Sequence, residues 1–126
     1  SVLVLRLALI RAHMCEKLAR ILKPELQEMV FTAGLFSLLD TLMNVSMAYV
    51  LEHLPLALEI REALLEGVGP FASILDRIRH WEQGELEGEG EQDEQHLQTM
   101  ASIYHEATRW ADHVYAFADG SATAES

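Results

Sequence analysis

The sequence predicts an all-α fold, and three observations support this prediction. Apolar residues recur at intervals of three and four along most of the chain, a spacing typical of one face of a helix. No segment alternates apolar and polar residues with a period of two, and no Asn-Gly or Asp-Gly pair lies between apolar runs. Prolines and glycines divide the helical pattern at a few points. We expect a compact bundle of about six helices in a single domain over residues 1–118.

The first predicted helix covers residues 2–22. Its main apolar stripe includes Leu3, Leu7 and Ile10, and Leu5 and Leu9 widen that stripe. A first helix with so wide an apolar surface is expected to be buried on more than one side. We therefore expect the chain to be the C-terminal part of a larger domain that lacks its front, and a homodimer formed through this helix is a further possibility.

Four more helices are predicted before residue 84. Pro24, followed by Glu25 and Glu28, is typical of a first helical turn. Gly34 lies inside the helix that begins there, where glycine costs about 1 kcal/mol relative to alanine, so we expect it to permit close helix packing. Asn44 or Ser46 is expected to cap the next helix. The predicted ranges are residues 24–44, 46–54, 57–66 and 71–83.

The remaining chain is predicted to be a linker, a helix and a tail. Residues 84–95 are rich in acids and glycines, with Leu86 the one apolar residue, so we expect a flexible acidic linker. Apolar residues at helical spacing then predict a last helix over residues 96–118. The small and polar residues 119–126 predict a disordered tail.

Composition argues against several classes of partner. The 126 residues include 9 Lys and Arg against 20 Asp and Glu, for a formal net charge of -11. Such a chain repels phosphate groups, so we expect neither nucleic acid nor an anionic membrane as a partner. No uncharged run reaches the length of a membrane span, and the opening residues lack the features of a secretory signal. The single cysteine, Cys15, cannot form an internal disulfide, which favours a cytoplasmic location.

No arrangement of residues predicts a catalytic, cofactor or metal site. His105 and His113 lie two helical turns apart, about 12 Å along the axis, too far to share one ion. His13, His53 and His80 have no ligand partner at a suitable spacing and are predicted to lie on the surface or at helix ends. Cys15, in the middle of a helix, is predicted to be structural. Ser37 lacks the Gly-x-Ser-x-Gly pattern of a nucleophile. Five aromatic residues are predicted to belong to the core: Phe31, Phe36, Phe71, Trp81 and Trp110.

Four segments together resemble the HDOD family, in the version found at the C-terminus of bacterial EAL-HDOD signalling proteins. They read RAHMCEKLA, FTAGLFSLLDTLMNVSM, VLEHLPLALEIREALL and YHEATRWA. The resemblance covers about residues 6–115. HDOD domains are helical relatives of the HD-type phosphohydrolases, whose metal ligands include an adjacent His-Asp pair. Ser37 and Leu38 fall at that pair, and an upstream family histidine falls near Leu7. The resemblance therefore implies that the metal ligands are lost.

The expected function is that of a noncatalytic regulatory module. The resemblance implies the output or interaction part of an EAL-HDOD protein similar to cyclic-di-GMP phosphodiesterases, acting on a protein partner or an attached signalling domain without a cofactor. One alternative is an HD-type metal-dependent phosphohydrolase with relocated ligands, such as Asp40, His105 or His113. Another is a plain helical self-assembly module.

Overall fold

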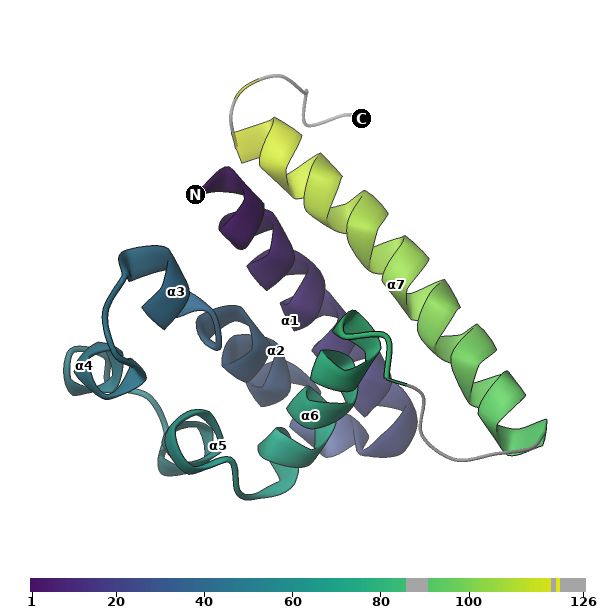
Figure 1. Ribbon diagram of the computed structural model, residues 1–126, viewed down its shortest axis with the longest axis horizontal. Helices are drawn as coiled ribbons and strands as arrows, with labels where there is room; N and C mark the ends of the chain where they lie inside the picture. Colours follow the sequence, from purple (N-terminus) through teal and green to yellow (C-terminus); the bar gives the residue numbers. More distant parts are fainter. Residues whose placement is uncertain (86–90, 119, 121–126) are drawn as a thin grey trace.

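The computed structural model describes residues 1–85, 91–118 and 120. Within these ranges the chain forms helices and contains no strand (Figure 1), which confirms the predicted all-α class. The predicted tail, apart from Gly120, and residues 86–90 of the predicted linker lie outside the described residues. The elements are α1 (Val2–Leu22), the 3-10 turn η1 (Pro24–Leu26), α2 (Gln27–Phe36), α3 (Leu39–Met43), α4 (Met47–Glu52), α5 (Leu58–Glu66), α6 (Pro70–Glu82) and α7 (Glu91–Ala118).

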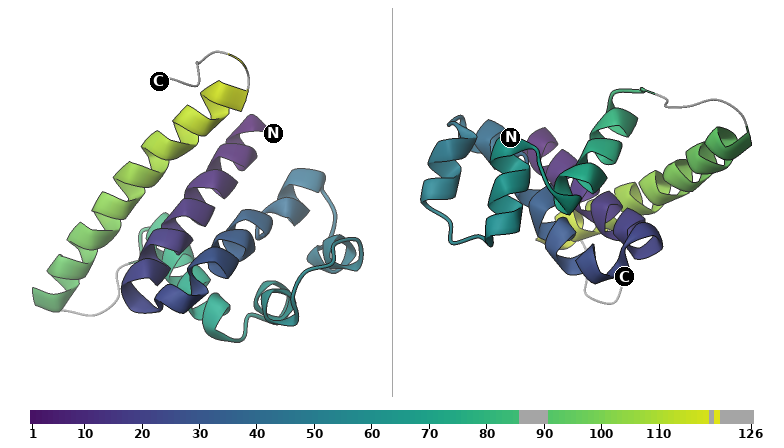
Figure 2. Two further views of the ribbon diagram at one scale, coloured as in Figure 1. Left: turned by 180° about the vertical axis from the view of Figure 1, so that it is seen from behind. Right: turned by 90° about the horizontal axis from the view of Figure 1, so that it is seen from below.

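Helix α1 lies at the centre of the arrangement. It packs between α2 and α7, and α7 runs antiparallel to it (Figures 1 and 2). Helix α6 crosses α1 and α2, whereas the short helices α3, α4 and α5 lie on the far side of α2 from α7. None of the described helices combines the length and the apolar character that a membrane span requires.

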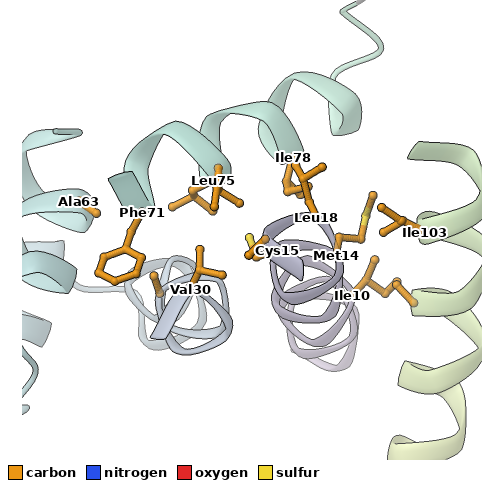
Figure 3. Close-up of a cluster of buried hydrophobic side chains, with 14 of the residues drawn as sticks. Ile10, Met14, Cys15, Leu18, Val30, Ala63, Phe71, Leu75, Ile78 and Ile103 are labelled. Carbon is orange, nitrogen blue, oxygen red and sulfur yellow. The ribbon is translucent and has the colours of Figure 1, made fainter. Parts of the chain in front are cut away.

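The core forms where α1, α2, α6 and α7 meet. Figure 3 shows Met14 of α1 beside Ile103 of α7, and Leu75 of α6 above Val30 of α2. Met14, Leu75 and Val30 are inaccessible to solvent. Each fully buried side chain of this size contributes about 1.5–3 kcal/mol relative to an exposed one. The four helices are therefore held together mainly by one apolar cluster.

The single helix predicted over residues 24–44 is wrong, because the chain leaves the helical path after Phe36. Leu38 has φ -114° and ψ 6°, and a new helix, α3, starts at Leu39. At the break the Ser37 hydroxyl donates a hydrogen bond to the Gly34 carbonyl at 2.7 Å. Serine bonds of this kind to a carbonyl one turn back are known to bend helices. The described residues thus contain seven α-helices, in agreement with a bundle of about six.

Most other boundaries agree with the predictions to within one or two residues. The Ser46 hydroxyl accepts a hydrogen bond from the Tyr49 N–H at 3.1 Å and caps α4, as predicted. The last helix starts at Glu91 instead of His96, so the predicted linker 84–95 is too long. The glycines of this region end at Gly90, and the Glu and Gln residues that follow have good helix propensity.

Gly34 lies where α2 packs closely against α1. A Cβ atom placed on it would lie 3.0 Å from the Cα of Ala12 and 3.1 Å from the Sγ of Cys15. Both of these neighbours are fully buried, so neither can move into solvent. The predicted role of Gly34 in close helix packing is confirmed.

Candidate functional site

A buried polar cluster lies at the break between α2 and α3, and we call Arg11, Ser37 and Glu82 the Arg11 cluster. Arg11 of α1 donates from Nη1 to Ser37 Oγ at 2.9 Å. It also donates from Nε and Nη2 to the two carboxylate oxygens of Glu82, at 2.9 and 2.5 Å. The cluster therefore joins three helices through one guanidinium group.

Each member of the cluster is placed by its own helix. Arg11 interrupts the apolar face of α1 between Ile10 and Ala12, Glu82 is the last residue of α6, and Ser37 follows the last residue of α2. The side chain of Arg11 is 8% exposed and that of Glu82 is 17% exposed. A charge this deeply buried is tolerated only when it is paired and hydrogen-bonded. The bidentate hydrogen bonds between Arg11 and Glu82 meet that requirement.

The two positions at which the resemblance places the His-Asp pair have different surroundings. Ser37 is buried within the Arg11 cluster, whereas Leu38 is half-buried and lines an apolar groove between α1 and α3. Leu7, where the upstream histidine would fall, is 36% exposed on α1. The structure therefore places a serine that is already bonded to a cation, and two leucines, at these three positions.

The structure does not bring together Asp40, His105 and His113, the candidates for relocated metal ligands. Asp40 lies in the first turn of α3, and its carboxylate accepts a hydrogen bond from the Thr41 N–H at 2.8 Å. His105 and His113 are exposed on α7, which lies across α1 from α3 (Figure 1). In the part of the chain that the structure describes, no group of three or more His, Cys, Asp or Glu side chains is arranged to hold a metal ion.

The prediction that His13 is a surface or helix-end residue is wrong. Its ring lies between α1 and α7 and stacks on Trp110, with ring centroids 4.8 Å apart. Its Nε2 has no hydrogen-bond partner among the described residues, and the Glu106 carboxylate, 3.7 Å away, is too far for a hydrogen bond. Burial lowers the pKa of His13 and outweighs the opposing effect of Glu106.

This burial predicts a loss of stability on acidification. Because the folded pKa of His13 is lowered, the unfolded chain binds more protons below its ordinary pKa of about 6.5. The contribution of His13 to stability is complete above that pH and is lost as pH falls through the lowered folded value. We expect H13F, which keeps an aromatic ring against Trp110, to show a flatter dependence of Tm on pH between about pH 7.5 and 5.

The matched control is H105F, since His105 is an exposed histidine on α7. Its dependence of Tm on pH should equal that of the unmodified chain. Equal slopes for H13F and the unmodified chain would contradict the assignment. The groups that face the His13 ring are Glu106 of α7 and Lys17 and Glu16 of α1, so these are left unchanged in both variants.

Cys15, Phe71, Trp81 and Trp110 agree with their predicted structural roles, whereas Phe36, predicted to belong to the core, is half-buried and lines the apolar groove. Cys15 is fully buried, and burial raises the pKa of its thiol to about 12, so it is almost wholly protonated at neutral pH and a poor nucleophile. Phe71 is buried in the core, and Trp81 and Trp110 pack against it. Phe31 meets Trp110 edge-on at 6.0 Å between ring centroids.

Comparison with known proteins identifies two relatives in sequence. The cyclic di-GMP phosphodiesterase CdgJ of Vibrio cholerae is 32% identical over 116 residues, which cover 86% of this chain and 26% of that protein. This chain is similar to one part of that phosphodiesterase. The uncharacterized protein YuxH of Bacillus subtilis is 32% identical over 76 residues, which cover 60% of this chain and 19% of that protein. The chain thus spans about a quarter or less of the length of these relatives.

No family model matches the chain. No solved structure matches it either. The similarity to CdgJ relates this chain to a signalling protein.

Proposed function

We propose that this chain is a noncatalytic regulatory module of the HDOD type, acting in the cytoplasm as the output or interaction part of an EAL-HDOD protein involved in cyclic-di-GMP signalling. The observation that carries the proposal is the Arg11 cluster. It includes Ser37, one of the two positions at which the resemblance places the metal-binding pair, and there a guanidinium group donates a hydrogen bond to the serine hydroxyl. The similarity to a cyclic di-GMP phosphodiesterase supports the signalling role.

The Arg11 cluster is unsuited to a divalent cation. An ion bound at Ser37 would lie beside the positive charge of Arg11, which is 2.9 Å from the hydroxyl. The carboxylate of Glu82 could ligate an ion, but both of its oxygens already accept hydrogen bonds from Arg11. Like charges at this separation repel strongly where solvent is excluded. The polar groups at this position therefore favour a structural link between helices over metal chemistry.

The same cluster suggests how the module passes a signal. Arg11 holds the end of α2 through Ser37 and the end of α6 through Glu82. A partner or an attached domain that shifts α1 must strain or break both contacts, because they share one side chain. Hydrogen bonds form only within narrow limits of distance and angle, so the contacts of Arg11 are either made or broken. A shift of α1 would therefore favour either the helix packing in which they are made or a packing in which they are broken. Under this proposal the output is a change in helix packing.

Metal binding and hydrolysis by the purified chain test the proposal against the phosphohydrolase alternative. The chain is stripped with a chelator, titrated with Mn²⁺ by calorimetry, and assayed with bis-p-nitrophenyl phosphate and with cyclic di-GMP. We expect no stoichiometric binding of Mn²⁺ and no turnover above a metal-only blank. Stoichiometric binding together with hydrolysis would overturn the proposal.

Two variants locate the site if such activity is found. D40A and H113A each remove a relocated-ligand candidate, and E66A removes an exposed glutamate at the end of α5 as the matched control. Activity that is lost in D40A or H113A and retained in E66A would assign the relocated ligands and establish the alternative function.

A further inference from the structure

Helix α7 is joined to the rest of the fold mainly through α1. The helices α1, α2 and α6 each pack against the other two, whereas α7 packs chiefly against α1 (Figure 2). Loss of the contacts made by α7 would therefore leave the packing among the other three helices in place. Local openings of this kind need less free energy than unfolding of the whole domain.

The contact between α7 and α1 has a small apolar part. Among the described residues of α7, the buried apolar side chains include two alanines, and they are Met100, Ile103, Ala107 and Ala111. The two acids of α7 that pair with α1, Asp112 and Glu106, are exposed, and exposed ion pairs add little stability. The docking of α7 is therefore sensitive to a change in a single buried group.

His13 is a buried polar group in the middle of this contact. On α1 it lies between Arg6 and Lys17, which form the ion pairs with α7. Its side chain is 8% exposed, and its ring stacks on Trp110 of α7. Its Nε2 has no hydrogen-bond partner among the described residues. A protonated ring would place a positive charge without a hydrogen bond inside the contact, and burial of such a charge is costly.

We propose that the protonation state of His13 controls the docking of α7: a neutral ring keeps α7 on α1, and protonation releases α7 while α1, α2 and α6 stay packed. Release exposes the ring to water, where its charged form is no longer penalised. Protons therefore bind the released state more tightly and shift the population toward it. This inference does not rest on the proposed signalling function.

The charged groups that act on His13 partly oppose one another. Burial has the largest effect and lowers the pKa of the ring. Glu106 of α7 opposes burial, Lys17 of α1 adds to it, and Glu16 of α1 opposes it. The net effect disfavours the charged ring while α7 is docked. Removal of Glu106 should therefore make docking more sensitive to acid.

Hydrogen exchange measured by mass spectrometry at pH 7.5 and 5.5 tests the proposal on the full chain. Protection factors corrected for the intrinsic exchange rate at each pH report the opening of each helix. From pH 7.5 to 5.5 we expect protection of residues 100–114 to fall about three- to tenfold, because one proton with an ordinary pKa of about 6.5 allows at most about tenfold. Protection of α2 and α6 should fall less than about twofold.

Three variants separate proton binding by His13 from a purely structural role. H13F keeps an aromatic ring against Trp110 and cannot be protonated, so the fall in α7 should disappear. E106Q removes the carboxylate that favours the protonated ring, so the fall should become larger. The control H105F changes an exposed histidine of α7 and should leave the fall unchanged. Circular dichroism checks that each variant folds.

The proposal is overturned if α7 loses no protection at pH 5.5, or if H13F shows the same fall, which would assign it to another group. It is also overturned if α2 and α6 lose protection in the same proportion as α7, because the fold would then open as one unit. If H13F does not fold, an unchanged or smaller fall in E106Q overturns the proposal instead.

Discussion

E82L is expected to lower the free energy of unfolding by about 3 kcal/mol, because it leaves the buried guanidinium of Arg11 without its carboxylate partner. Most of this loss is expected to come from the unpaired Arg11, because a buried charge without a partner keeps its full desolvation cost. The lost attraction between the two charges contributes less. Urea unfolding followed by circular dichroism measures the change.

A double variant separates the cost of an unpaired charge from the value of the pair. R11M/E82L replaces both charges with apolar side chains of similar size, and such replacements are often close to neutral. We expect it to recover most of the stability that E82L loses. The exposed-pair control is D76A, which removes the contact between Asp76 and Arg79 at 3.7 Å and should cost less than about 1 kcal/mol. A loss in E82L no larger than that in D76A would show that the Arg11 cluster is not a buried link.

The second large effect is expected at Gly34. G34V should destabilise the fold by about 2–3 kcal/mol, because its side chain would push into the backbone of α1 at Ala12. The sign of the stability change in G34A tests whether there is room for a methyl group at this position. If there were room, alanine would stabilise α2 by about 1 kcal/mol through helix propensity. We expect instead that the contacts at 3.0 and 3.1 Å make G34A destabilising.

The control for G34V is E28V, which introduces the same β-branched residue at an exposed position of α2. It measures the effect of helix propensity together with the loss of a carboxylate from the first turn of α2, at about 1 kcal/mol in all. Thermal unfolding of the three variants gives the comparison. A stabilised G34A would show that α1 and α2 can separate slightly at this point without loss.

The fold was largely predictable because local patterns determine most of its helices. The first helix was predicted with the bounds that α1 has, and Ser46 was recognised as a cap from its residue type alone. The break after Phe36 was not predictable in this way. The apolar spacing of Leu35, Leu38 and Leu42 continues across it, and the cause of the break includes a bond to Ser37 from Arg11, 26 residues earlier.

The candidate site was predicted only in part. The resemblance drew attention to Ser37 and Leu38, but it gave no indication of Arg11 or Glu82, because their pairing joins residues 71 positions apart. One signal was present: Arg11 is a charged residue inside an otherwise apolar helical face, which indicates a buried charge in need of a partner. His13 was misplaced for a similar reason, since its burial depends on Trp110 of a distant helix.

The antiparallel arrangement of α1 and α7 also has a practical use. It brings the start of α1 and the end of α7 to the same end of the molecule (Figure 1), and Ser1 and Ala118 are both exposed there. A donor and an acceptor fluorophore at these two positions would give strong energy transfer while α7 is docked and weak transfer once it separates. Release of one helix could thus be followed optically while the contacts among α1, α2 and α6 stay intact.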